Sequence, residues 1–453
     1  MSNFILKTLE TRELKLNTIR LRGFYGGKLR KGSGGGGSGD GFPQLPGDVT
    51  RWHFGGLTNE MMAAMDDPRI EDADHKGRFL SFKNFAWKEG SGISDIYPGA
   101  LVFDGVDDRG VCENFPILTK EKGYTVVVLR QWDQDFLNTT LTGGLLSTRN
   151  YSTGEGVAFE KIESSNKGYW NLGAGGFIDF AKSPFTWQTS KQYNNVGILK
   201  GDKNHGKPLC VGCGLSRGQQ CGRFAIWELV FLDHDATEEE LTKIKDYFVK
   251  TYPWLFPDQA WTVVGKTNED EDRATIANIT GNGNDLVCLN LGFIEGSGYN
   301  EEGEYAGYLV TDGVDDKITS STFEMGNDWT VIGDWELINT GKNDNAGIVK
   351  FDSIVIYNYN PILINIKNGR NNLIPDQNTV NAICSDGRIY SKDWKESIYN
   401  EETESTSKNL LTIGYSGNSY TKIAFKNLAI YPTVLSKEDC IKAYNYLQTL
   451  KAK

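Results

Sequence analysis

The feature that most constrains this chain is a pair of short acidic, glycine-bearing motifs that occurs twice in the same order. EGSG followed by DGVDD lies at 89–92 and 104–108, and again at 295–298 and 312–316. Self-similarity at a nearly fixed spacing is the signature of a duplicated structural unit. The sequence therefore predicts two copies of one fold.

Three further blocks extend the match in both directions. Trp52-x3-Gly-x-Thr-Asn-Glu recurs from Trp261, and YTVVVLRQW at 124–132 corresponds to WTVIGDWEL at 329–337. The segment 224–248 corresponds to 423–447 with a constant offset of 199 residues. Since all five blocks keep their order, we predict tandem copies at 42–257 and 258–453.

Each copy has the composition of an antiparallel β-sandwich. At 453 residues the chain is too long for one ordinary hydrophobic core, and it holds 52 glycines and 12% aromatic residues. Alternating runs rich in Val, Ile and aromatic residues, cut by Gly, Asn and Asp, are typical of half-buried strands. We expect one terminal helix per copy, with Thr237 and Ser436 as N-caps and Glu240 and Asp439 at the third helical position.

Charge divides the chain into a basic arm and an acidic body. Residues 1–31 contain eight Lys or Arg and two Glu, a net charge of +6, so a total of −11 leaves −17 for residues 32–453. The glycine- and serine-rich stretch Gly32–Gly41 predicts a joint between the two parts. Residues 1–41 are therefore predicted to be an extended anchoring arm.

The arm has the chemistry of a strand that adds to a partner's sheet edge. Its alternating apolar positions need a covering partner, and its basic residues favour an acidic surface. The predicted contact residues are Phe4, Leu6, Lys7, Arg12, Leu14, Leu16, Ile19, Arg20, Leu21, Arg22, Lys28, Arg30 and Lys31.

Compartment signals in the sequence are few. The first 20 residues have neither an apolar core nor a small-residue cleavage site, and no apolar run approaches the roughly 20 residues of a membrane span. Seven irregularly spaced cysteines do not form the pattern of a disulfide framework, which favours synthesis in a reducing cytosol. We expect a homodimer or homotrimer, with neither nucleic acid nor a membrane as partner.

The DGVDD motifs have two interpretations. In the first, Asp104 and Asp312 cap a turn through their side chains, while the following glycine supplies a positive φ. In the second, the carboxylates bind Ca²⁺, which takes six to eight oxygen ligands. The candidate ligands would be Asp104, Asp107, Asp108, Asp312, Asp315 and Asp316. Because carboxylates beside glycine are ordinary turn chemistry, the turn interpretation is preferred and no other cofactor is expected.

Catalysis and zinc binding receive little support. The E-x-D-x-x-E spacing that would place two carboxylates on one strand face is absent, and none of the four histidines has a nucleophile or zincin setting. No catalytic residue is therefore predicted. His205, Cys210, Cys213 and Cys221 could hold zinc. However, Cys210 aligns with Thr412 and Cys213 with Tyr415 of the second copy, which favours ordinary strand and hairpin positions.

The motifs also carry a family resemblance. The L-x-FDG-x-DD strand and turn, with a late strand leading into FLDHDATEEEL or IYPTVLSKEDC, resembles concanavalin A-like/LamG jelly rolls over about 80–250 and 285–450. The resemblance implies a two-sheet antiparallel jelly roll in each copy.

The segment TNEDEDRATIANITGNGNDL, together with EGSGY and DGVDD, resembles virion proteins of phages of gut Bacteroidales, including the crAss-like group. This implies a non-enzymatic head-fibre, decoration or tail protein, made in the host cytoplasm and located in the virion. The arm would dock on a capsid or tail protein, and the two domains could add adhesion to glycans. The alternative is a carbohydrate-binding adhesin or bacterial surface lectin outside a virion; the arm favours the virion protein.

Overall fold

The fold was determined as a computed structural model of the full chain. It describes residues 40–116, 123–137, 139–141, 143–148, 158–162, 167–171, 176–179, 196–200, 208–215, 219–338, 347–351, 354–357, 363–366, 370–373, 380–398, 409–416 and 419–452. The chain divides into two compact units, Met1–Gln44 and Leu45–Lys453, and the elements below belong to the second. The predicted arm contacts lie outside the described residues.

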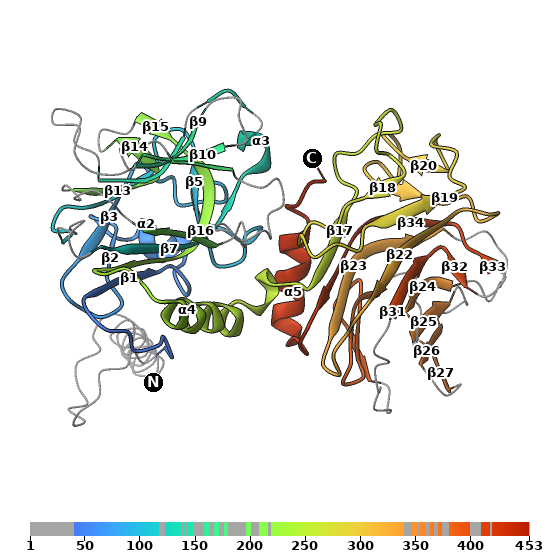
Figure 1. The fold of residues 1–453 in the computed structure, drawn as a ribbon. Helices are drawn as coiled ribbons and strands as arrows, with labels where there is room; N and C mark the ends of the chain where they lie inside the picture. The colour runs from blue at the N-terminus through green and yellow to red at the C-terminus, as the bar shows by residue number, and fades with distance from the viewer. Residues whose placement is uncertain are drawn as a thin grey trace, which may run out of the picture. The chain divides into compact units, whose positions relative to one another are not determined.

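The predicted all-β fold is confirmed (Figure 1). One sheet of the first half is built around the long strand β16. It runs in the order β12 (Val196–Lys200), β7 (Thr125–Trp132), β16 (Arg223–Leu232), β5 (Leu101–Asp104) and β4 (Gly92–Ile93), and β1 (Val49–His53) also pairs with β16.

The opposing sheet of the first half runs in the order β11 (Gly176–Asp179), β10 (Lys167–Asn171), β9 (Ala158–Ile162), β8 (Gly143–Ser147), β13 (Leu209–Val211), β6 (Arg109–Cys112), β3 (Phe79–Lys83) and β2 (Arg69–Glu71). The hairpin of β14 (Cys213–Leu215) and β15 (Gln219–Cys221) joins this sheet through β8.

The second half repeats this order around the long strand β34. Its first sheet runs β20 (Gly298–Tyr299), β21 (Leu309–Val310), β34 (Ile423–Tyr431), β23 (Thr330–Leu337), β28 (Val380–Cys384), β29 (Arg388–Ser391) and β30 (Glu396–Ile398), and β17 (Gln259–Thr262) pairs with β34.

The other sheet of the second half runs β18 (Thr275–Ile276), β19 (Leu286–Leu289), β22 (Lys317–Phe323), β31 (Asn409–Ile413), β24 (Gly347–Phe351), β25 (Ile354–Tyr357), β26 (Leu363–Ile366) and β27 (Arg370–Leu373). A separate hairpin joins β32 (Tyr415–Ser416) to β33 (Ser419–Tyr420).

Equivalent strands thus occupy equivalent places in the two halves. β7, β16, β5 and β4 correspond to β23, β34, β21 and β20, and the N-terminal strands β1 and β17 pair with β16 and β34. Each pairing given for the described residues joins strands of the same half. Two separately folding domains divided near residue 257 stay a prediction, because Leu45–Lys453 forms one compact unit.

Two apolar clusters form the cores. One contains Trp52, Phe103 and Phe231, and the other contains Trp261, Leu309 and Phe425. The two indole N–H groups donate to backbone carbonyls, Trp52 to Arg78 at 3.2 Å and Trp261 to Asn284 at 2.9 Å. Burying each ring with its polar atom satisfied is what allows tryptophan to lie in a core.

Both terminal helices begin as predicted. In α4 (Glu238–Thr251) the Thr237 side chain accepts from the Glu240 N–H, and the Glu240 carboxylate accepts in return from Thr237. In α5 (Lys437–Leu447) the Ser436 hydroxyl accepts from the Asp439 N–H. Shorter helical segments are α2 (Asn59–Ala63), α3 (Gln134–Leu137) and the 3-10 turn η1 (Pro253–Leu255). Among the described residues, no helix has the length and apolarity needed to cross a membrane.

Candidate functional site

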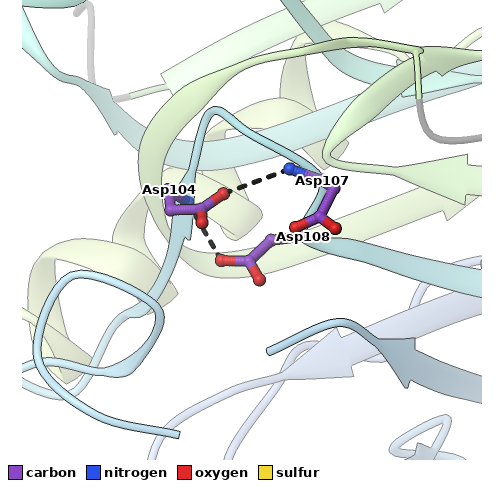
Figure 2. A group of neighbouring side chains, drawn as sticks. All are labelled: Asp104, Asp107 and Asp108. Atoms are coloured by element: carbon purple, nitrogen blue, oxygen red, sulfur yellow. Dashed lines mark hydrogen bonds between the residues drawn. The ribbon is translucent and has the colours of Figure 1, made fainter. Parts of the chain in front are cut away.

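The first DGVDD motif forms a side-chain-capped turn at the end of β5. Asp104 Oδ1 accepts from the Val106 N–H at 2.8 Å. It also accepts from the Asp107 N–H at 3.4 Å (Figure 2). Gly105 lies at φ +78°, where a residue with a Cβ would be strained. These are the contacts that the turn interpretation requires.

Asp108 connects this turn to the EGSG motif. Its fully buried carboxylate accepts from the Asp104 N–H at 3.0 Å and from the Ser91 hydroxyl at 3.0 Å. Ser91 Oγ itself accepts from the Ala86 N–H at 2.9 Å. Burial raises the pKa of Asp108 to about 7, because the surroundings disfavour its charged form.

The second copy repeats this network residue for residue. Asp312 Oδ1 accepts from the Val314 N–H at 2.7 Å, and the Asp316 carboxylate accepts from the Asp312 N–H at 2.8 Å. The Ser297 hydroxyl donates to Asp316 at 2.7 Å, and burial again raises the pKa of that carboxyl. EGSG and DGVDD therefore recur together because, in each copy, the serine of EGSG donates a hydrogen bond to the buried last aspartate of DGVDD.

A third repeated motif, Thr-Asn-Glu, completes the same corner. Asn59 donates to the Ile93 carbonyl and accepts from the Ile93 N–H, both at 2.7 Å. Asn268 makes the equivalent pair of bonds with Tyr299, at 2.7 and 2.8 Å. In each copy the asparagine side chain thus bonds to the backbone of β4 or β20 as a neighbouring strand would. The asparagine can approach this closely because the last glycine of EGSG has no side chain.

The three carboxylates of each turn lie near enough to be considered as a cation site. Their oxygens lie within 4.8 Å of one another in Asp104, Asp107 and Asp108, and again in the second copy. In the first copy each carboxylate already accepts hydrogen bonds within the fold, since Asp107 accepts from Asn84 at 2.9 Å. Three oxygens from one turn fall short of the six to eight that Ca²⁺ takes. These contacts favour the turn interpretation, and calcium binding stays an untested hypothesis.

The cysteine cluster forms a disulfide. Cys213 and Cys221 face each other across the β14–β15 hairpin and are bonded to each other. While bonded, these two cysteines cannot serve among the four ligands considered for zinc. The Cys210 thiol is buried beside them, and burial raises its pKa to about 12. His205 lies outside the described residues. The sequence predicted no disulfide framework and missed this bonded pair, because an odd number of irregularly spaced cysteines does not reveal a single disulfide.

The second copy shows that this hairpin needs a cross-strand contact but not cysteine. Tyr415 and Tyr420 pair across the β32–β33 hairpin, and their ring centroids are 4.8 Å apart. A disulfide in one copy and an aromatic pair in the other thus stabilise the same structural position.

A buried ionic network lies between β16 and α4. The Glu228 carboxylate accepts from the hydroxyls of Tyr252 at 2.9 Å and Tyr247 at 3.2 Å, is 2.6 Å from His53 Nδ1, and pairs with Arg51 at 3.4 Å. The corresponding residue of β34 is the neutral Asn427. Because so many donors converge on Glu228, we interpret this cluster as structural: it fixes α4 and the segment that follows it to the sheet.

The described residues also form a pocket of about 230 Å³ in the first sandwich. It is lined by Glu89, Gly90, Ile96, Tyr97, Val102, Asp133, Arg223 and Phe224. The sequence predicted none of these as site residues. The only signal available was that Glu89, Gly90 and Phe224 belong to repeated segments.

Comparisons with known proteins give no family assignment. No protein-family model matches the chain, and no curated protein matches it. Solved structures with a distant likeness include the Trypanosoma rangeli sialidase in complex with sialic acid, at 9% identity and a TM-score of 0.31, covering 83% of this chain and 67% of that one. The botulinum neurotoxin serotype D ligand-binding domain in complex with N-acetylneuraminic acid has 10% identity and a TM-score of 0.31, covering 80% and 94%.

The receptor-binding domain of botulinum neurotoxin type G has 12% identity and a TM-score of 0.26, covering 42% of this chain and 50% of that domain. Likenesses at this level are too distant to support an argument about function. The interpretation below therefore depends on the chain's own residues.

Proposed function

We propose that this protein is a non-enzymatic display protein of a bacteriophage virion, anchored by residues 1–41 and presenting two β-sandwiches that bind glycans. The observation that carries the proposal is the opposition of charge between the +6 arm and the −17 remainder of the chain. A basic segment with alternating apolar residues suits docking on an acidic partner surface, while a free lectin has no use for it.

The site geometry is compatible with display rather than catalysis. The repeated carboxylates accept hydrogen bonds from their own turns, and Glu228 lies in a closed structural network. The resemblance of the repeated motifs to virion proteins of gut Bacteroidales phages, and to LamG-like jelly rolls, supports the same assignment. A head fibre, a capsid decoration and a tail-associated protein all satisfy it.

Deletion of residues 1–31 tests the anchor. We expect the deleted protein to keep its thermal melting temperature and to be lost from purified particles, as measured by quantitative mass spectrometry of virions. Deleted protein present at full copy number would refute the anchoring role. A lowered melting temperature would instead show that the arm folds back on its own chain.

A further inference from the structure

We infer that the pocket between the EGSG turn and the start of β16 is a binding site for one neutral saccharide unit. This inference rests on the glycan-binding part of the proposed function and names its site and ligand class. Four segments build the pocket: the turns at 89–97, Val102 of β5, the residue after β7, and the first residues of β16.

The acceptors of the pocket are fixed in place before a ligand arrives. Glu89 accepts from the Ser94 hydroxyl at 2.6 Å and from the Asp95 N–H at 2.9 Å. Asp133 accepts from the Phe136 N–H at 2.8 Å and lies 3.5 Å from Arg223 Nε. Carboxylates held in this way can accept from sugar hydroxyls with little loss of side-chain entropy.

The apolar part of the pocket is equally rigid. Phe224 is buried, stacks on Phe103 with ring centroids 4.7 Å apart, and packs edge to face with Trp132 with ring centroids 5.3 Å apart. Ile96, 50% exposed, forms the outer wall. A pyranose ring has C–H groups on its faces and hydroxyls around its rim, which suits a pocket lined by apolar side chains and a few polar groups.

Size and charge define the ligand further. A volume of about 230 Å³ is below the roughly 300–1,000 Å³ of pockets for drug-sized ligands, so it suits one ring. Glu89 and Asp133 contribute two negative charges and Arg223 one positive charge, which Asp133 already neutralises. An anionic sugar would be repelled, whereas a neutral one can donate to the carboxylates and accept from the guanidinium.

The second sandwich provides an internal comparison. The Ile338 N–H donates to the Lys422 carbonyl at 3.1 Å, as the Asp133 N–H donates to the Arg223 carbonyl at 3.1 Å. Equivalent positions therefore hold Ile338 in place of Asp133 and Lys422 in place of Arg223. Ile423 also replaces Phe224, so the second copy lacks both the ion pair and the aromatic wall.

Saturation-transfer NMR on the full-length protein tests the inference, with neutral methyl hexosides, 6-deoxyhexosides and N-acetylhexosaminides as ligands and sialyllactose as the anionic competitor. We expect a neutral glycoside to bind to the wild type. Its Kd should rise about tenfold or more in Arg223→Ala and in Asp133→Asn, because each variant loses a charge-assisted hydrogen bond to the sugar. The matched variant Lys422→Ala should bind as the wild type does. Asparagine can still cap α3, and thermal melting of each variant verifies folding.

Other results of the NMR experiment would overturn the ligand class, the location of the site or the glycan role separately. Preferential binding of sialyllactose would overturn the neutral class. Neutral binding unchanged in both pocket variants would show that the site lies elsewhere and leave the glycan role intact. Absence of binding to every glycoside would overturn this inference together with the glycan role, while the arm deletion decides virion anchoring independently.

Discussion

Replacing Gly92 by alanine should destabilise the first sandwich much more than replacing Gly90, two residues away. Both glycines have positive φ, +146° at Gly92 and +85° at Gly90. A Cβ at Gly90 would meet nothing within 4 Å, whereas one at Gly92 would overlap Asn59 Oδ1 and lie 3.0 Å from two backbone atoms of Trp87 and Lys88. The pair therefore separates backbone strain from steric conflict.

The expected magnitudes follow from these contacts. Gly90→Ala carries only the left-handed backbone cost, about 1 kcal/mol. Gly92→Ala adds the displacement of Asn59, whose two hydrogen bonds to Ile93 contribute about 1 kcal/mol each. We expect a total of about 3–4 kcal/mol for Gly92→Ala.

Urea unfolding followed by tryptophan fluorescence measures the difference, because both cores contain buried tryptophans. Gly298→Ala provides a replicate in the second copy, where a Cβ would lie 2.7 Å from Phe293 Cα and 2.8 Å from Ile294 N. Equal destabilisation by Gly92→Ala and Gly90→Ala would refute the proposed role of the asparagine bridge.

Three further predictions concern individual groups of the first sandwich. The folded pKa of Asp108 is raised from 3.8 to about 7, so between these values the folded state keeps a proton that the unfolded state has lost. Stability should therefore fall by about 1–2 kcal/mol as pH rises from about 4 to 7, allowing for solvent screening, and Asp108→Asn should remove this part of the urea-unfolding profile. Glu228→Gln should cost about 3–5 kcal/mol in the same assay, since it removes the buried carboxylate that pairs with Arg51; an effect below 1 kcal/mol would contradict the structural interpretation. Cys213 and Cys221 are eight residues apart, so reduction of their disulfide should lower the free energy of unfolding by about 2–3 kcal/mol. Peptide mapping without reductant should show no other disulfide.

Local sequence patterns were sufficient to predict much of the fold. Alternating apolar residues identified the long strands, and Thr237 and Ser436 marked the helix starts because a cap is made by residues three positions apart. The DGVDD turns were predictable for the same reason: Asp104 bonds N–H groups only two and three residues ahead. Interactions of short sequence separation can be recognised without knowing the topology.

Contacts between distant segments could not be predicted in this way. The pocket joins Glu89 to Asp133 and Arg223, which become neighbours only when β5, β7 and β16 pair. The link from Ser91 to Asp108 likewise depends on how two loops pack. The disulfide was hidden because nothing in a CxxC spacing indicates that Cys213 faces Cys221 and not Cys210.

Comparison of the two copies separates positions that the fold requires from positions that it leaves free. The serine–aspartate–asparagine corner is present in both copies with matching hydrogen bonds, so the fold has a use for its buried carboxylate in each copy. The pocket positions differ between copies while the strand pairing beneath them is the same: Ala225 lies opposite Val102 on β16 and β5, and Ala424 lies opposite Val310 on β34 and β21. Since the sandwich forms with either Asp133 or Ile338 at the same backbone position, the charged pair of the first copy is not needed for folding. That independence agrees with the proposed saccharide site, in which Asp133 and Arg223 lie beside Phe224 and can bond to a ligand.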